Sequence, residues 1–306
     1  MRRLAIALSV LLAGCNLIFQ LQDPPVADAA LPVDADIDGS IDGKIFDALY
    51  GDATIVGDSR LCWDPDQVAF DEDNDGIKDG CDNCPTIENF AQANGDDDDL
   101  GDACDPHTGL LDKIVLWHNF QAGIPTGWTG SGFWVHENGS YRQTNEAFGS
   151  EISVYGGSKF TYATVHLLMS DVRSPTGANN EAIAGAYLWT TKTPAEVQVP
   201  PGVFCLERRP NSQPANDIIE IHEIDPGSGS VTIGTDQIQG GRGELTHLRI
   251  ASKASGDVSK VSCLIARGTN QPTTLTSNDP SGEGYIALFT KNTGARFRAV
   301  LVSETP

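Results

Sequence analysis

Residues 71–105 read DEDNDGIKDGCDNCPTIENFAQANGDDDDLGDACD, and this acidic stretch with its cysteines decides how the rest of the chain is interpreted. Its first twelve residues, 71–82, place carboxylates at alternate positions, a glycine at the sixth and an acid at the twelfth. Ca²⁺ takes about six to eight oxygen ligands, and a loop of this length supplies them from alternate positions. An acidic, solvated loop is the simpler alternative, but it does not require this combination of spacing, turn glycine and closing acid. We therefore predict a calcium site formed by Asp71, Asp73, Asp75, the carbonyl of Ile77, Asp79 and Asp82.

The residues after the closing acid do not favour a helix, although calcium loops of the EF-hand kind continue into one. Asp82 is followed by Asn83, Cys84 and Pro85, and proline disfavours a helix interior because it lacks an N–H and clashes with the preceding turn. The order Asp-Asn-Cys-Pro, followed about twenty residues later by Gly-Asp-Ala-Cys-Asp, resembles the thrombospondin type 3 repeat. That resemblance covers residues 71–105 and implies a calcium-wrapped, disulfide-stapled segment with little conventional core.

The resemblance also implies a second calcium loop when the sequence is aligned from its Gly101–Asp105 end. This loop departs from the family at two positions, since Asn94 stands where the family has an acid and Asp99 where it has the turn glycine. Asp tolerates left-handed backbone geometry better than most residues, so we expect a second site that binds calcium more weakly than the first. Its ligands would be Asn94, Asp96, Asp98, the carbonyl of Leu100, Asp102 and Asp105.

The N-terminus reads MRRLAIALSVLLAGCN, in which two arginines precede an apolar run of ten residues. This run is too short to span a bilayer as a helix, and it fits a secretory signal. Its Leu-Ala-Gly-Cys15 end resembles the signal of bacterial lipoproteins, which implies cleavage before Cys15 and a diacylglycerol on its thiol. A non-lipidated signal with an incidental cysteine is the alternative. We expect residues 1–15 to be a lipoprotein signal and the lipid to be the membrane anchor, with Asn16 implying the outer membrane.

The seven cysteines also indicate export. Without Cys15 six remain, and an even number in an exported chain indicates three disulfides. A metal–thiolate site at Cys81-x-x-Cys84 is the rival interpretation, but it lacks further soft ligands at suitable spacing and is surrounded by carboxylates. Neighbourhood in the sequence, together with the repeat resemblance, favours the pairs Cys62–Cys81, Cys84–Cys104 and Cys205–Cys263.

Residues 16–60 are rich in Asp, Ala and Pro and show no sustained hydrophobic period. Nine acidic residues stand against only Lys44 and Arg60, a composition typical of disordered chains. The fragment 34–42 imitates half of a calcium loop, but its twelfth position is Ile45, which offers no closing carboxylate. We therefore predict a disordered acidic linker that holds a domain away from a membrane surface.

The net charge of −22 is distributed unevenly along the chain. Residues 16–105 carry 24 acidic and three basic side chains, whereas residues 106–306 carry 18 and 15. Nucleic acid is disfavoured as a partner, because binding a phosphate backbone needs a basic face. Within the predicted repeat, residues 61–105, fifteen acids stand against Lys78 and few large apolar side chains. We expect this segment to fold only when bound cations neutralise it.

From residue 106 the chain consists of short segments in which apolar and polar residues alternate. Period two indicates half-buried strands, while clusters of Gly, Pro and Asn separate the segments and no long amphipathic helix is evident. We therefore predict that residues 106–306 form two antiparallel sheets packed face to face, so that the protein is mainly β. The alternating sets are Val231 and Ile233; Leu248 and Ile250; Val261, Cys263 and Ile265; Tyr285, Ala287 and Phe289; and Phe297, Ala299 and Leu301.

The order of these segments resembles the concanavalin-like, laminin-G-type jelly roll. Trp128 and Trp134 lie near its start, residues 284–290 near its end, and residues 295–302 read as a final strand. The resemblance covers most of residues 115–304 and implies a jelly-roll β-sandwich. Thrombospondins also place a lectin-like sandwich after their calcium repeat, which is an analogy at the level of the fold.

Some jelly rolls of this class are glycoside hydrolases, which need two carboxylates flanking the bond that is cleaved. The best candidate segment, residues 219–225, places Glu220 and Glu223 on opposite faces of a strand, because they are three residues apart. The six histidines show no zinc-binding spacing, and we predict no catalytic residue. Four tryptophans could stack on sugar rings, but packing in the core is the preferred interpretation of Trp117, Trp128, Trp134 and Trp189.

These observations predict a lipid-anchored protein of the outer membrane or cell surface of a bacterium, in which a linker and a calcium repeat present a β-sandwich. The expected function is adhesion through a glycan or a surface protein. A glycoside hydrolase or lyase on the same fold, and a structural spacer without a ligand of its own, are the alternatives. A paired-carboxylate cleft would favour the enzyme, and an exposed groove with aromatic faces would favour glycan binding.

Overall fold

The computed structural model describes most of the chain from residue 70 onward, with Cys62 before it. The described residues are 62, 70–131, 133–145, 149–173, 181–190, 202–210, 214–225, 229–242, 245–252, 261–268, 270, 272–277 and 283–305. The predicted signal and linker, with Cys15, lie outside them. The chain from Arg60 onward forms one compact unit. Among the described residues, no helix has the length and apolar character that a membrane crossing needs.

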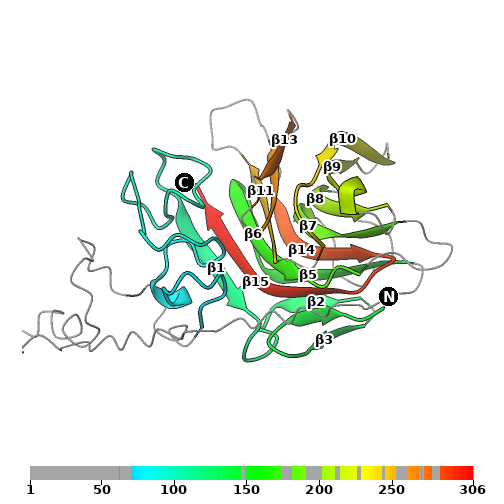
Figure 1. The fold of residues 1–306 in the computed structure, drawn as a ribbon, viewed down its shortest axis with the longest axis horizontal. Coiled ribbons are helices and arrows are strands. Elements are labelled where there is room, and N and C mark those ends of the chain that lie inside the picture. The colour runs from blue at the N-terminus through cyan, green and yellow to red at the C-terminus, as the bar shows by residue number, and fades with distance from the viewer. Residues whose placement is uncertain are drawn as a thin grey trace, which may run out of the picture. The chain divides into compact units, whose positions relative to one another are not determined.

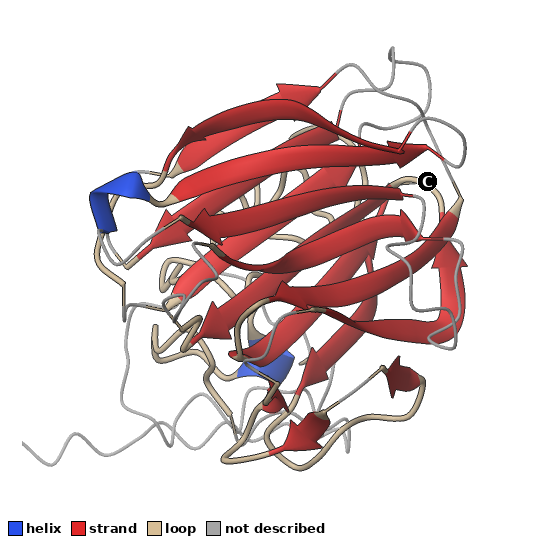
Figure 2. Ribbon diagram, turned by 90° about the vertical axis from the view of Figure 1, so that its right-hand side faces the viewer, coloured by secondary structure: helices blue, strands red, loops and turns tan. Residues whose placement is uncertain are grey.

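Two antiparallel sheets make up this unit, which confirms the predicted mainly β sandwich (Figures 1 and 2). Sheet A has the strand order β13-β12-β11-β6-β15-β4-β3, with β1 beside β15. Its strands are β1 (Lys113–Asn119), β3 (Trp134–His136), β4 (Tyr141–Gln143), β6 (Ala163–Ser170), β11 (Thr246–Ser252), β12 (Val261–Arg267), β13 (Thr273–Ser277) and β15 (Ala295–Glu304). Sheet B has the order β10-β9-β8-β7-β14-β5-β2. Its strands are β2 (Trp128–Gly130), β5 (Ser150–Phe160), β7 (Ala182–Thr190), β8 (Gly202–Arg209), β9 (Ile218–Asp225), β10 (Gly229–Gln237) and β14 (Gly284–Lys291).

The core lies between the sheets and takes alternate residues from each strand. Leu248 and Ile250 of β11 face it as the period predicts, and so do the apolar residues of β12. Two predicted sets are broken by β-bulges, where one extra residue reverses the alternation. In β15 the register shifts between Phe297 and Ala299, so Phe297 faces the core but Ala299 does not. In β10 the register shifts between Thr232 and Gly234, and Val231 is exposed.

A disulfide joins the two sheets across this core. Cys205 of β8 in sheet B is bonded to Cys263 of β12 in sheet A, and both are fully buried. The other two bridges, Cys62–Cys81 and Cys84–Cys104, lie in the acidic part of the chain. All three pairs are those expected from the sequence.

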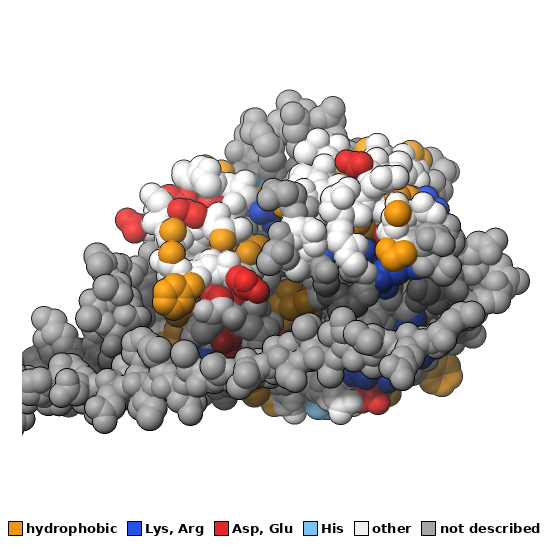
Figure 3. Space-filling view, viewed as in Figure 1, with side chains coloured by type: hydrophobic (Ala, Val, Ile, Leu, Met, Phe, Trp, Pro, Cys, Tyr) orange, Lys and Arg blue, Asp and Glu red, His pale blue; other side chains and the backbone are white. Residues whose placement is uncertain are grey.

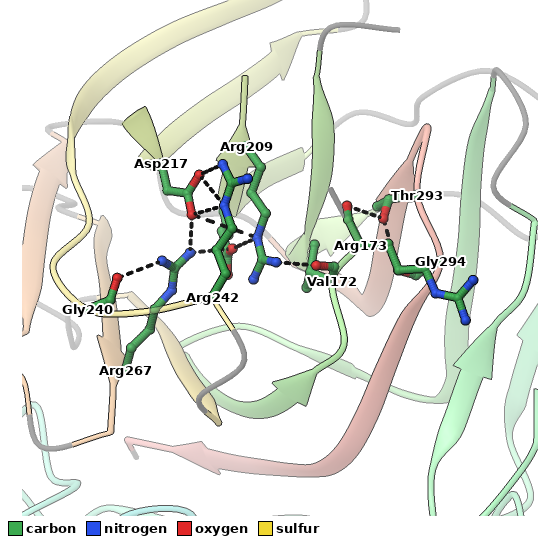
Figure 4. A network of polar contacts seen from close by, with 10 residues as sticks. Val172, Arg173, Arg209, Asp217, Gly240, Arg242, Arg267, Thr293 and Gly294 are labelled. Carbon is green, nitrogen blue, oxygen red and sulfur yellow. Dashed lines mark hydrogen bonds and ion pairs between the residues drawn. The ribbon is translucent and has the colours of Figure 1, made fainter. Parts of the chain in front are cut away.

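A buried network of charges ties the sheets together at one end (Figure 4). Arg267 of β12 is fully buried and donates to Glu207 of β8 and, at 3.0 Å, to Asp217, which precedes β9. Arg242 donates to the same Asp217 carboxylate at 2.7 Å, and Arg209 pairs with Glu207. Arg209, Arg242 and Arg267 therefore each have a carboxylate partner, as buried charges require.

Residues 70–112, which we call the acidic segment, pack against the outer face of sheet A (Figure 1). A second apolar cluster forms there from Leu100 and the Cys84–Cys104 bridge of the segment and from Trp117, Leu168, Ala299 and Leu301 of the sheet. Polar contacts support it, since Arg298 lies 2.8 Å from Glu72 and Asn119 donates to Asp79 at 3.0 Å. The segment is therefore a packed part of the sandwich, which differs from the expectation of a segment with little core.

Candidate metal centre and aromatic face

The first predicted loop brings its alternate carboxylates together. One oxygen from each of Asp71, Asp73 and Asp75 lies within 4.8 Å of the others. Asp73 accepts a hydrogen bond from the N–H of Asp75 at 3.2 Å, and Asp75 accepts one from the N–H of Ile77 at 2.7 Å. Left-handed backbone at Asn74 (φ 66°) and Gly76 (φ 96°) turns the loop back on itself. This geometry aims carboxylate oxygens at one centre.

The carboxylates of this loop are buried and close to one another, which disfavours their ionised forms, and a bound cation would stabilise those forms. Burial, together with the charges of Asp82 and Asp75, raises the pKa of Asp73 to about 8. Burial also raises the pKa of Asp82 to about 7, although hydrogen bonds from Gln92 and from the N–H of Cys84 oppose the shift. One buried oxygen of Asp71 and one of Asp73 have no hydrogen-bond partner among the described residues. The donor set, carboxylate oxygens with unused lone pairs, fits a hard divalent cation.

The second loop repeats the internal bonding of the first, 23 positions later. In each loop the ninth residue donates its N–H to the carbonyl just before the loop, and its carboxylate accepts from the second residue. In each, the carboxylate at position five accepts from the N–H at position seven, and that at position twelve from the N–H two residues on. These pairs of bonds are Asp79–Phe70 and Asp102–Ala93, Glu72–Asp79 and Gly95–Asp102, Ile77–Asp75 and Leu100–Asp98, and Cys84–Asp82 and His107–Asp105.

The two loops differ at the positions where the sequence departs from the family. Position four is left-handed in both, at Asn74 and Asp97, but only Gly76 is left-handed at position six. Asp99 instead accepts a hydrogen bond from the N–H of Ile114 at 3.2 Å, which ties the loop to β1. Asn94 uses its amide within the loop, accepting from the N–H of Asp97 at 2.8 Å. At both positions the second loop therefore uses a hydrogen bond where the first has an acid, Asp71, or a left-handed glycine, Gly76.

Two candidate metal ligands near the second loop, His107 and Asp112, were not predicted from the sequence. Oxygens or nitrogens of Asp105, His107 and Asp112 lie within 4.8 Å of one another. His107 Nδ1 is 2.9 Å from Asp112 Oδ2, and Nε2 is 2.8 Å from the carbonyl of Ser252. Asp96 and Asp98 accept backbone N–H groups of this same stretch, at Gly109 and Asp112. No spacing in the sequence marks His107, because its partners come from its own turn, from Ser252 of β11 and from Thr305 after β15.

The outer face of sheet B carries a third apolar cluster, which is separate from the core. Tyr187 of β7, Phe204 of β8, and Phe289 and Tyr285 of β14 share this face; we call it the aromatic face. The rings of Tyr187 and Phe204 lie 4.2 Å apart, and His222 of β9 stacks on Phe204 at 5.3 Å with 15° between the planes. Tyr187 and Phe204 are buried, whereas Tyr285 and His222 are half-buried.

Paired charges surround the aromatic face. Glu220 of β9 lies 2.8 Å from Arg208 Nε and 2.9 Å from His222 Nε2, and Lys291 lies 2.8 Å from Glu181. Burial alone would raise the pKa of Glu220, but the hydrogen bond from His222 and the charge of Arg208 outweigh it and lower the pKa. Glu220 is therefore an ionised acceptor. The face it shares with His222 and Ile224 is opposite to that of Ile219 and Ile221, as the strand period predicts.

The tryptophans pack as predicted from the sequence. Trp117 belongs to the cluster beneath the acidic segment, and Trp189 lies in the core. Trp128 and Trp134 pack against the core from its edge, and the indole of Trp128 donates to His118 at 2.9 Å. The aromatic face is therefore built from tyrosine and phenylalanine, and the sequence pattern does not mark these residues as a common surface. Only their period-two spacing in β14 could have indicated a shared face.

No family model and no curated protein matches this sequence. Several solved structures of lectin-like sandwiches are similar in fold. The carbohydrate recognition domain of Emp47p is 12% identical with a TM-score of 0.48, covering 61% of this chain and 94% of that one. A legume lectin-like domain from Entamoeba histolytica is 12% identical with a TM-score of 0.46, covering 59% and 91%. The VIP36 exoplasmic/lumenal domain, in a Ca²⁺- and mannose-bound form, is 14% identical with a TM-score of 0.45, covering 59% and 84%.

Proposed function

We propose that this protein binds glycans at a bacterial cell surface, with calcium holding its acidic segment and the sandwich binding the sugar. The observation that carries this proposal is the aromatic face of sheet B, where four aromatic rings and an imidazole share one surface of adjacent strands. Sugar rings present apolar C–H surfaces and several hydroxyl groups. A site for them therefore combines aromatic area with a few fixed polar groups.

The aromatic face supplies both kinds of contact. Tyr285 and His222 are half-buried at its edge and offer ring surface to a ligand. Glu220 and Arg208 hold each other at 2.8 Å, so their hydrogen-bonding atoms are fixed before a ligand arrives. The hydroxyl of Tyr187 is buried without a partner among the described residues.

Calcium has a structural role in this proposal. Asp71, Asp73, Asp75, Ile77, Asp79 and Asp82 would hold one ion in the first loop, and Asn94, Asp96, Asp98, Leu100, Asp102 and Asp105 would hold a weaker one in the second. The metal supplies positive charge where buried carboxylates otherwise repel one another. Support comes from the convergent oxygens of the first loop and from the bonding that the two loops share.

A glycan array probed with the full chain in calcium tests the binding proposal. Tyr285→Ala and His222→Ala should each weaken binding about tenfold, because each removes stacking area or a fixed polar contact. Phe133→Ala, which removes a 63% exposed aromatic ring beside β3 in sheet A, is the matched control and should leave binding unchanged. Binding that survives both face variants, or a folded protein that binds no glycan, would contradict the proposal and favour the spacer interpretation.

The lipid anchor is part of the same proposal and rests on the sequence, because Cys15 lies outside the described residues. Cys15→Ser should release the protein from membranes or leave it as an uncleaved precursor. Detergent partitioning and the mass of the mature N-terminus measure this. A variant that matures and partitions like the unaltered protein would remove the anchor from the proposal.

A further inference from the structure

A groove of about 370 Å³ lies between the acidic segment and the outer face of sheet A. Thr86 and Ile87 of the segment form one wall, and Leu168, His247, Arg249 and Leu264 form the floor. Figure 3 shows the surface hollowed between the segment, at the left, and the sandwich. The volume falls in the range of small-molecule sites, about 300–1,000 Å³. The groove is on the opposite sheet from the aromatic face.

Arg249 gives this groove a positive charge that no ion pair among the described residues neutralises. Its side chain is half-buried, and its only hydrogen bond to a described residue runs from Nη1 to the carbonyl of Cys104 at 3.4 Å. Its buried Nε has no hydrogen-bond partner among the described residues, and the charge of Asp105 acts on the guanidinium without forming an ion pair. The arginines of the network in Figure 4 show the contrast, since Arg242 and Arg267 both pair with Asp217. A guanidinium removed from water without an anion is costly.

Thr86 provides a second polar group without a hydrogen-bond partner among the described residues. Only 2% of its surface is exposed, and its hydroxyl has no hydrogen-bond partner among the described residues. An isolated buried hydroxyl costs free energy unless something bonds to it. Thr86 stands on the segment wall and Arg249 on the sheet floor, so a single ligand in the groove can meet both.

The remaining lining residues indicate the charge and shape of that ligand. His247 lies 3.2 Å from His166 through ring nitrogens, and burial, followed by the charge of Arg249, lowers the pKa of His247 to about 3. His247 is therefore neutral and adds a hydrogen-bonding group without a second charge. Leu168 and Leu264 add an apolar floor. One cation, neutral polar groups and an apolar surface suit a single carboxylate on a small ring better than a phosphate dianion.

We propose that this groove binds a sugar acid, whose carboxylate pairs with Arg249 and whose hydroxyls meet Thr86 and His247. The acids nearby do not replace such a ligand. Glu88 lies at the exposed rim, and Asp73 is directed to the first loop. Because Thr86 belongs to the acidic segment, the site exists only while that segment is packed on sheet A.

Isothermal titration and ligand-observed NMR of the full chain with D-glucuronate, and with D-glucose as its uncharged counterpart, test the proposal. Glucuronate should bind and glucose should not. Arg249→Gln should weaken glucuronate binding at least about tenfold, and Thr86→Val should weaken it severalfold. Arg142→Gln is the matched control, because Arg142 pairs with Glu137 away from the groove, and it should bind glucuronate normally.

Thermal unfolding separates a binding role of Arg249 from a structural one. Without ligand, Arg249→Gln should be at least as stable as the unaltered chain, because an unpaired buried charge is removed, and glucuronate should stabilise only the chain that keeps Arg249. A large loss of stability in the unliganded variant would assign Arg249 to structure and overturn the proposal. Equal binding of glucose and glucuronate, or no binding of either, would also overturn it. Tyr285→Ala should leave glucuronate binding intact, so this experiment can contradict the groove proposal without contradicting the proposal for the aromatic face.

Discussion

Asp73 shows how one residue connects the fold to the proposed metal site. Only 5% of its surface is exposed, and one of its oxygens lacks a partner among the described residues. Burial, together with the charges of Asp82 and Asp75, raises its pKa to about 8. Below that pH the metal-free loop retains a proton that a bound cation has to displace. The twelve-residue spacing predicted Asp73 as a calcium ligand, and the structure brings its carboxylate together with those of Asp71 and Asp75. Its protonation depends on burial beside sheet A, which no spacing reveals.

Calcium binding should therefore release protons at neutral pH. The pKa of Asp73 in the metal-free fold lies above its usual value, so the protonated form is favoured below about 8 and calcium requires the ionised form. Affinity should rise as the pH is raised from about 6 to about 8 and then level off, while the metal-free fold loses stability over the same range. Titration in two buffers of different ionisation enthalpy measures the protons. Identical heats in both buffers would contradict this expectation.

Gly76 is the second residue on which the first loop depends. Its φ of 96° is left-handed, and an added Cβ would meet no atom within 4 Å, so any penalty is conformational. Gly76→Ala should cost about 1–2 kcal/mol of calcium-binding free energy at the first site. The reverse change, Asp99→Gly, restores the family residue but should not strengthen the second site, because Asp99 is not left-handed and bonds to Ile114. Calcium titration of both variants checks this, and a tighter second site in Asp99→Gly would contradict it.

At the scale of the elements, the strands show how far the alternation of apolar and polar residues predicts which side chains face the core. Period two located β11 and β12 and their buried faces, because each runs without interruption between the sheets. The same reasoning failed along β15, where the bulge after Phe297 sends Ala299 and Leu301 outward and brings Val300 and Val302 into the core. Val and Leu can be buried either in the core or under the acidic segment. A bulge therefore leaves no mark in such a sequence, and the surface on which the acidic segment packs could not be predicted.

The bridge between β8 and β12 should contribute strongly to stability. Cys205 and Cys263 are 58 residues apart and join the two sheets, so the bond restricts a long loop of the unfolded chain. Replacing both by Ala should lower the free energy of unfolding by about 2–5 kcal/mol. Urea denaturation monitored by the signal of the sandwich measures the loss. A double variant as stable as the parent would show that the core alone holds the sheets together.

At the scale of the whole molecule, the acidic segment and the sandwich behave as one unit. The sequence separates them by charge and composition, and nothing in it pairs Glu72 with Arg298 or Leu100 with Trp117. Those contacts join residues that are distant in the chain, and each partner reads as an ordinary member of its own segment. The sequence shows a change of charge and composition near residue 105, but the packing across that position could not be predicted.

Chelation of calcium should therefore destabilise strands of sheet A as well as the acidic segment. Hydrogen exchange should increase in β1 and in the second half of β15, because these strands share an apolar cluster with the segment. Exchange in β8 and β14 of sheet B should change little, since their contacts are with the core and the aromatic face. An unchanged β1 after chelation would indicate that the segment stays packed without metal.

The placement of two disulfides has a mechanical consequence for a chain pulled from its N-terminal side. Cys62–Cys81 and Cys84–Cys104 close two consecutive rings, with only Asp82 and Asn83 between them. Tension would pass through the sulfur atoms and bypass residues 63–80 and 85–103, so most of the predicted calcium ligands of both loops would carry no load. In force spectroscopy, stretching the segment should release on the order of 100 Å more length after reduction than before. The two disulfide rings would therefore let the protein bear a pulling force while the proposed cation sites keep their shape.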